Sequence, residues 1–305
     1  MADTSDEPRE LMVIGVPIDC VGAPTPDDAP FGTELAPGAL RSAGVVAALG
    51  AADAGDLDVR LTGRHRDLET GVLGWPAVRE VTGAVRAGVQ AAVAAGRVPV
   101  VLGGCCTLLP GALAGARDAG GPLGLAYLDG HLDLYDGDTS PTGEPADMPV
   151  AVVVGHGPLA WAVEVGAPLV KADRLALLGP RDRVEAVSLG SALPEQLGIE
   201  PELTPARLRA DGVAATGQRV RDRLSGSGEG YWVHLDVDVL DEREFPATDY
   251  LMPGGLTLPE LAELITPLTR APNLIGFSLG CYNPEKDVDG HCGRDLIGLL
   301  AQALA

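Results

Sequence analysis

The sequence predicts a three-layer α/β/α fold with a mostly parallel central sheet. The first observation is a set of six short, almost continuously apolar runs, each bounded by Gly, Pro or charged residues. Such runs are typical of strands that are buried on both faces. The second observation is that longer segments with helical patterns lie between these runs. Alternation of strand and helix implies right-handed crossovers, which place helices on both faces of a parallel sheet.

The elements follow in chain order. The predicted strands cover residues 11–16, 98–102, 123–128, 174–178, 231–235 and 274–279. The predicted helices cover residues 77–95, 108–116, 205–224, 258–268 and 294–304. Ser, Thr or Pro opens several of these helices, and Thr257-Leu-Pro-Glu260 has the spacing of a capping box.

Two segments rich in Gly, Pro and Asp, residues 24–30 and 136–149, are predicted to be long surface loops. The second follows the carboxyl end of a strand, where open α/β sheets place their ligands. No repeat, linker or low-complexity tract divides the chain of 305 residues. We therefore expect residues 11–305 to form a single domain, preceded by a disordered lead-in over residues 1–10.

Composition excludes several classes of partner. Hydrophobic residues make up 46% of the chain, which is enough for a sizeable core, and the formal net charge is −21. Like-charge repulsion would oppose binding to nucleic acid or to an anionic membrane. No apolar run approaches the roughly eighteen residues that span a bilayer, and the acidic N-terminus is not a secretory signal. Five unevenly spaced cysteines do not form a disulfide framework, so a cytoplasmic setting is expected.

The segment YLDGHLDLYD, residues 127–136, places Asp129, His131 and Asp133 at alternate positions. Successive side chains of a strand point to opposite faces, so these three would share one face if the segment were extended. The alternative is a strand end that runs into a polar turn with solvated side chains. This segment alone does not decide between them.

A second acidic segment favours a metal site. In YWVHLDVDVLD, residues 231–241, the side chains of His234, Asp236 and Asp238 would share the face opposite the large apolar residues. Buried carboxylates without compensation are very costly, and a divalent cation is the usual solution. The two segments together offer four carboxylates and one imidazole, which suit a hard or borderline divalent metal with room for two ions. These candidate ligands are Asp129, His131, Asp133, Asp236 and Asp238.

At these residues the chain resembles the ureohydrolase family of arginases, agmatinases and formiminoglutamases. The family patterns GGDHS, DAHxD, SxDxDxxDP and ExNP correspond here to GGCCT at 103–107, DGHLD at 129–133, HLDVDVLD at 234–241 and CYNP at 281–284. IGVPID at 14–19, PGALR at 37–41, GPRD at 179–182 and PGGLT at 253–257 also look like that family. The likeness therefore runs through nearly the whole chain in order.

The resemblance implies an arginase-like fold, a homo-oligomer and one or two Mn²⁺ ions that activate water to attack a guanidinium or amidine carbon. By position, one metal would have its full ligand set and the second would have three of its four protein ligands. The full set is Asp129, His131, Asp236 and Asp238, and the partial set is Asp129, Asp133 and Asp236. Asp133 would also hold and orient the nucleophile.

The sequence departs from the family at three cysteines. Cys106 stands at the His that completes the second metal site, and Cys105 stands at the Asp before it. Thiolate is softer than imidazole and favours Zn²⁺ over Mn²⁺, so Cys106 could ligate a metal, remain a buried thiol or pair with Cys105. We expect one well-occupied metal site and a weak or altered second one. Cys281 stands at the Glu that pairs with the substrate guanidinium, which favours a neutral or less basic substrate group.

A further departure concerns the loop at residues 136–149. Ala146 aligns with the His that carries protons in arginases, and Glu144 aligns with an Asn. General acid–base help is worth about 10²–10⁴-fold in rate, so another group must replace it. His156, Asp147 and Glu144 are the candidates. Small-molecule substrate contacts are expected from Thr142, Glu144 and Cys281.

Three functions remain open from the sequence. The first is a metal-dependent hydrolase of a linear C–N bond, in a guanidine, amidine or related group, with non-standard specificity. The second is a catalytically silent relative with a structural or regulatory role, which the lost family residues favour. The third is a thiol-based or zinc-tuned redox site at Cys105 and Cys106.

Overall fold

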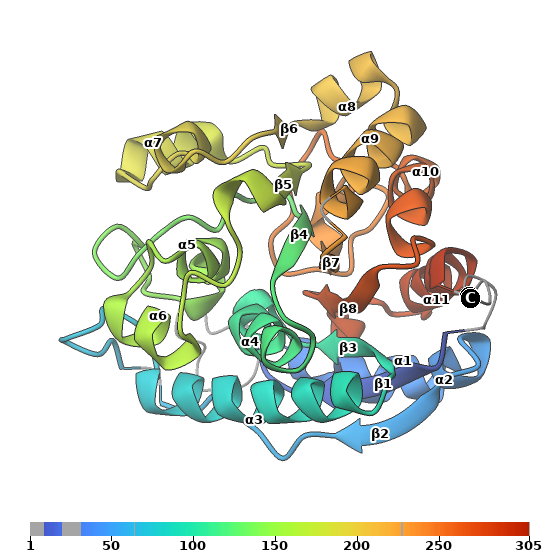
Figure 1. Cartoon of the computed structure of the whole chain (residues 1–305), viewed down its shortest axis with the longest axis horizontal. Coiled ribbons are helices and arrows are strands. Elements are labelled where there is room, and N and C mark those ends of the chain that lie inside the picture. Colours follow the sequence, from blue (N-terminus) through green and yellow to red (C-terminus); the bar gives the residue numbers. More distant parts are fainter. Residues whose placement is uncertain (1–8, 20–31, 64, 227, 305) are drawn as a thin grey trace.

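An eight-stranded, all-parallel sheet organises the protein in a computed structural model, which describes residues 9–19, 32–63, 65–226 and 228–304 (Figure 1). The strand order is β2-β1-β3-β8-β7-β4-β5-β6. The predicted loop at 24–30, Cys20 and most of the predicted lead-in lie outside the described residues. The strands are β1 (Leu11–Val16), β2 (Ala52–Asp56), β3 (Val98–Gly103), β4 (Leu123–Leu128), β5 (Leu175–Leu178), β6 (Glu202–Leu203), β7 (Gly230–Asp236) and β8 (Leu274–Gly280).

All six predicted strands are confirmed, with ends that shift by at most one residue. The two strands that the sequence did not indicate, β2 and β6, are the edges of the sheet. Strand β2 (ADAGD) has no buried residue, and β6 has only two residues. Neither contains the apolar run by which buried strands are identified, because one side of an edge strand faces away from the core.

The helices confirm four of the five predicted segments and correct one. Residues 205–224 form two helices rather than one, because Gly212 adopts a positive φ of 82° and separates α8 from α9. Helices α1, α2, α5, α6 and α7, of four to seven residues each, are too short to show a helical period. The helices are α1 (Ala36–Ser42), α2 (Val45–Ala48), α3 (Trp75–Ala94), α4 (Leu109–Gly120), α5 (Pro149–Val154), α6 (Leu159–Val165), α7 (Arg183–Leu189), α8 (Pro205–Asp211), α9 (Val213–Ser225), α10 (Leu258–Thr269) and α11 (His291–Leu304).

Two groups of helices cover the sheet. Helix α3 packs against α4, and α5 and α6 join them, while α10 packs against both α9 and α11. Figure 1 shows these groups on either side of the strands, which confirms the three-layer α/β/α prediction. Among the described helices, none combines the length and apolar character needed to cross a membrane.

The four central strands, in the order β3-β8-β7-β4, determine where a site can form. Because all strands are parallel, their carboxyl ends meet at one edge of the sheet. Close packing supports this centre: a Cβ on Gly276 of β8 would lie 2.0 Å from the ring of Trp232 on β7. The indole of Trp232 also donates a 2.9 Å hydrogen bond to the Ser278 hydroxyl.

Gly104, directly after β3, tests this packing. A Cβ at this position would lie 1.3 Å from the carbonyl oxygen of Ile18, so Gly104→Ala must displace backbone. We expect the free energy of unfolding to fall by at least about 2 kcal/mol in urea titrations. The control is Gly83→Ala, on the exposed side of α3 with nothing within 4 Å, which should raise it by about 0.5–1 kcal/mol. Equal effects of the two substitutions would contradict this account.

The capping box predicted at the start of α10 is confirmed and gives a pH-dependent test. The Thr257 hydroxyl accepts from the Glu260 amide, and the Glu260 carboxylate accepts from the Thr257 amide. A hydrogen bond from Arg209, and then those from Thr257, lower the pKa of Glu260 to about 2. A depressed pKa stabilises the fold above the unfolded-state pKa, and this contribution is lost as the pH falls towards 2.

Glu260→Gln should therefore lower the free energy of unfolding near neutral pH, with a difference from the wild type that shrinks on acidification. Solvent screening limits the effect to about 1 kcal/mol. Urea titrations at about pH 7, pH 5 and pH 3 measure the difference. Glu263→Gln, on an exposed residue of the same helix, is the control and should show no such trend.

Candidate active site

A cavity of about 180 Å³ lies where the carboxyl ends of β3, β8, β7 and β4 meet. Its lining includes every residue predicted for the site except His156. The lining residues are Cys106, Asp129, His131, Asp133, Tyr135, Pro141, Thr142, Glu144, Ala146, Asp147, Asp182, Glu185, Asp236, Asp238, Tyr250 and Cys281. Eight carboxyl side chains therefore line the cavity, whereas no Lys or Arg lines it among the residues that the structure describes.

Asp129, His131 and Asp238 form one ligand group of this cavity. One ligand atom from each side chain lies within 4.8 Å of the others. The Nδ1 atom of His131 lies 3.0 Å from Oδ2 of Asp238 and 3.4 Å from Oδ1 of Asp129. Backbone amides orient both carboxylates, since the Gly130 amide donates to Asp238 and the His131 amide donates to Asp129. Two carboxylates and one imidazole suit a hard or borderline divalent metal.

Loops, rather than extended strands, bring these residues together, and this corrects the predicted alternation. Strand β4 ends at Leu128, and Asp133 has a positive φ of 50°. Strand β7 ends at Asp236, and Asp238 lies in the following 3-10 turn, Val237–Val239. The Asp236 carboxylate caps this turn by accepting a 2.8 Å hydrogen bond from the Asp238 amide. The carboxylates converge because both strands end at the same edge of the sheet.

Burial and mutual repulsion raise the pKa values of three carboxyl groups in the cavity. Burial, followed by the charge of Asp238, raises the pKa of Asp129 to about 7. Burial also raises the pKa of Asp133 and of Asp236 well above the ordinary range, and neighbouring carboxylates add to both shifts. A divalent cation among these groups would favour their ionised forms. The side chains present therefore fit a metal centre.

His131 and Asp238 form an ion pair within this cluster. Burial is the largest single effect on His131 and disfavours its charged form, but the charges and hydrogen bonds of Asp238 and Asp129 together raise the pKa of the imidazole well above its ordinary value. Burial likewise opposes ionisation of Asp238, but His131, the Gly130 amide and Arg181 together lower the pKa of that carboxyl. A metal bound here would take the place of the proton on His131, because only neutral imidazole is a ligand.

A second ligand group combines Cys106, Asp236 and Cys281, whose ligand atoms also lie within 4.8 Å of one another. The Sγ atom of Cys106 lies 2.9 Å from Oδ2 of Asp236 and 3.9 Å from Sγ of Cys281. Cys105, in contrast, directs its Sγ towards the carbonyl of Asp19 and the hydroxyl of Thr107. Cys105 and Cys106 are both free thiols, so the structure shows no Cys105–Cys106 pairing.

Two buried aromatic side chains, Tyr127 and His234, contact residues that line the cavity. The Tyr127 hydroxyl donates a short hydrogen bond to Oδ2 of Asp133 and fixes this carboxylate. The Tyr127 ring stacks on His234, with ring centroids 5.0 Å apart. Burial lowers the pKa of His234 to about 3, so its imidazole is neutral. Its Nε2 lies 3.2 Å from the Cys106 sulfur, and its Nδ1 lies 2.7 Å from the Ser278 hydroxyl.

The loop at 136–149 lies partly at the surface, with Asp138, Pro141 and Thr142 exposed, and it also lines the cavity. Glu144 is only 2% exposed, and its Oε2 accepts a 2.6 Å hydrogen bond from the Tyr250 hydroxyl. Its other oxygen, Oε1, is buried and has no hydrogen-bond partner among the described residues. Burial, then the charge of Asp147, raises the pKa of Glu144 to about 8. Thr142 supports the segment by accepting a 3.1 Å hydrogen bond from the Glu144 amide.

Two predicted proton carriers have different positions. Asp147 lines the cavity, and its Oδ2 accepts hydrogen bonds from Ser140 and Thr142. His156 is exposed in the segment after α5 and does not line the cavity. The structure therefore does not bring His156 to the carboxylate cluster.

Sequence reasoning gave no site role to six lining residues, among them Tyr250, Asp182 and Tyr135. Tyr250 holds Glu144 and lies edge-on to the His131 ring, with centroids 6.0 Å apart. Asp182 accepts from the Leu132 amide, and Tyr135 completes the wall. Of these three, only Asp182 had a signal in the sequence, because it belongs to the GPRD segment. Tyr250 lies in an irregular segment with no motif, so its contact depends on the tertiary structure alone.

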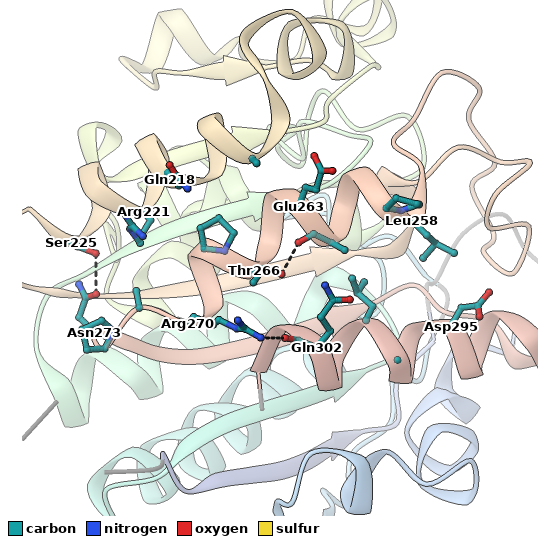
Figure 2. Close-up of a pocket in the computed structure, with 18 of the residues that line it drawn as sticks. Gln218, Arg221, Ser225, Leu258, Glu263, Thr266, Arg270, Asn273, Asp295 and Gln302 are labelled. Atoms are coloured by element: carbon teal, nitrogen blue, oxygen red, sulfur yellow. Dashed lines mark hydrogen bonds between the residues drawn. The ribbon is translucent and has the colours of Figure 1, made fainter. Parts of the chain in front are cut away.

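A wider surface groove of about 1430 Å³ runs between α9, α10 and α11 (Figure 2). The groove contains none of the predicted site residues. Its polar side chains bond mainly to one another or to nearby backbone, as Ser225 does with Asn273 at 3.0 Å and Arg270 with the Gln302 carbonyl at 2.9 Å. The groove therefore lacks the convergent ligand atoms that characterise the cavity.

Comparison with known proteins identifies the family. The sequence model of the arginase family matches residues 9–304. An arginase from Brevibacillus brevis is 28% identical over 306 residues, covering 96% of this chain and 97% of its own. The crystal structure of Bacillus caldovelox arginase superposes with a TM-score of 0.86 at 26% identity, covering 97% and 98% of the two chains. Bacillus cereus arginase gives a TM-score of 0.83 at 25% identity, with 97% and 99% covered.

These matches extend over the whole sheet and include the segments that form the cavity. The convergent carboxylates and imidazole at the sheet edge are a site of the kind that metal-dependent hydrolysis requires. On both grounds, the chain belongs to the arginase family of metal-dependent hydrolases.

Proposed function

We propose that this protein hydrolyses a C–N bond in a compact guanidine, amidine or related group, with a substrate specificity different from that of arginine-cleaving relatives. The convergence of Asp129, His131 and Asp238 carries the proposal, because these side chains would hold Mn²⁺. A bound divalent cation would lower the pKa of a water molecule and so supply a nucleophile at neutral pH.

Asp133 is proposed to accept the proton of the attacking water. Its carboxylate lines the cavity beside Asp129, and the Tyr127 hydroxyl holds one of its oxygens in place. A fixed carboxylate loses little entropy when it orients a reacting group. Two acids of the loop at 136–149, Asp147 and Glu144, could pass a proton to the leaving nitrogen.

Substrate recognition is proposed to depend on Glu144, with Thr142 and Cys281 beside it. Position 281 has no carboxylate, but the unpartnered Oε1 of Glu144 lines the same cavity. The acidic lining favours a cationic substrate group. This changes the expectation of a neutral group, which was based on Cys281 alone. Glu144 lies in the loop at 136–149 and would therefore bind the substrate from a different direction than a carboxylate at position 281 would. The accepted substrate would accordingly differ in shape from that of arginine-cleaving relatives.

The metal requirement is tested by Asp238→Asn. This substitution removes one ligand and the ionic partner of His131, so metal affinity should fall by at least about tenfold. Metal per chain is measured by plasma mass spectrometry, and hydrolysis is measured on a panel of guanidines, amidines and amides. Asp138→Asn, at an exposed position, is the control and should leave both unchanged. Metal binding without turnover of any substrate would favour the catalytically silent alternative.

The recognition role is tested by Glu144→Gln. The loss of a charged hydrogen bond, worth about 1.5–3 kcal/mol, should raise KM about 10- to 100-fold. The pKa of Glu144 is raised to about 8, so its carboxyl ionises as the pH rises. The wild-type KM should accordingly fall as the pH rises towards 8, whereas the KM of Glu144→Gln should not. Glu185→Gln makes the same charge change at an exposed lining residue and should alter KM little.

A further inference from the structure

We propose that Cys106, Cys281 and Asp236 form a second metal site whose two thiolates select a thiophilic cation such as Zn²⁺ over Mn²⁺. The inference rests on the proposed function only in placing metal ions in this cavity. It makes Cys281 a metal ligand, in addition to the thiol of Cys106.

The strand order brings the two cysteines together. Cys106 opens the turn after β3, and Cys281 directly follows β8, the neighbouring parallel strand. The amide of Cys281 donates a 2.6 Å hydrogen bond to the carbonyl of Gly104, which holds the two turns together. Both cysteines are buried, and both line the cavity.

The distances suit a tetrahedral metal. Two thiolates at about 2.3 Å from a tetrahedral Zn²⁺ lie about 3.8 Å apart. The sulfur atoms of Cys106 and Cys281 are 3.9 Å apart, close to this value and far from the roughly 2.05 Å of a disulfide. The third ligand, Asp236, lies 2.9 Å from the Cys106 sulfur through its Oδ2 atom. A cation could enter this group with small side-chain shifts.

The backbone at Cys281 supports a role for its side chain. Its φ of 66° lies in the left-handed region, which glycine adopts without strain. A β-carbon there is unfavourable and persists where the surrounding structure compensates for it. Glycine would suffice if only the turn mattered, so the thiol itself is the useful feature of this residue.

Asp133 does not provide the third ligand in this arrangement. Its Oδ2 accepts the hydrogen bond from Tyr127, and among the described residues its carboxylate joins none of the groups whose ligand atoms converge. The second site thus has two sulfur ligands and one oxygen ligand. Soft thiolates favour Zn²⁺, whereas the oxygen- and nitrogen-rich group at Asp129, His131 and Asp238 favours Mn²⁺. Binding would release the proton of each thiol to solvent.

The test uses the full-length protein, stripped with chelator and reloaded with Mn²⁺, Zn²⁺ or Co²⁺. Thiolate ligation of Co²⁺ produces a charge-transfer absorption in the near ultraviolet, and metal per chain is counted by plasma mass spectrometry. The wild type should bind one Mn²⁺, and a second equivalent only of Zn²⁺ or Co²⁺, with the thiolate absorption. Cys281→Ser should reduce this absorption to about half and weaken the second metal by more than about tenfold.

Two further variants keep the test decisive. Cys105→Ser removes a neighbouring buried thiol that faces Asp19 and Thr107, so it should behave as the wild type. Cys281→Asp should restore the second equivalent while the absorption stays at half. Wild-type Co²⁺ binding without thiolate absorption, a Cys106–Cys281 disulfide found by thiol titration, or no effect of Cys281→Ser would each overturn the proposal. Absence of any bound metal would instead contradict the proposed function.

Discussion

The concentration of buried negative charge at one edge of the sheet is the constraint on which the rest of this structure depends. Asp129, Asp133, Asp236 and Asp238 lie within one small cavity and are each at most 6% exposed. Such a cluster is stable only with protons or cations between the carboxylates. The raised pKa values of Asp129, Asp133 and Asp236 and the His131–Asp238 ion pair are consequences of this crowding. A divalent cation bound among the carboxylates would satisfy the same constraint.

The departures from the family pattern redistribute ligands and charge rather than remove them. Position 281 has no carboxylate, but the carboxyl group of Glu144, in the loop at 136–149, lines the same cavity. The imidazole absent at Cys106 leaves a thiol that contacts Asp236 and faces a second thiol. Together these changes preserve an anionic cavity and alter the softness of its ligands and the direction of its substrate contact. The proposed specificity and the proposed second metal both follow from this redistribution.

Local sequence patterns predicted the elements that pack on two faces. Strands β4 and β8 were evident because their residues are apolar and buried on both sides. Edge strand β2 was not, since its exposed residues carry no apolar signal, and the helix at 205–224 was drawn too long because a single glycine, Gly212, ends α8. Helical period and strand composition are averages over several residues. They therefore do not predict a helix break that depends on the dihedral angle of one residue.

The sequence by itself determined the layer architecture, the family and the residues able to bind a metal, because these depend on residue type, local period and short motifs. The tertiary structure decided which of those residues meet. Cys106 and Cys281 are 175 positions apart and are in contact only because β8 inserts beside β3. Likewise, Glu144 lines the cavity and His156 does not, because of the path that the chain takes between β4 and α6. Strand order and loop path are long-range properties, since they arise from the packing of the whole chain rather than from any local window of residues.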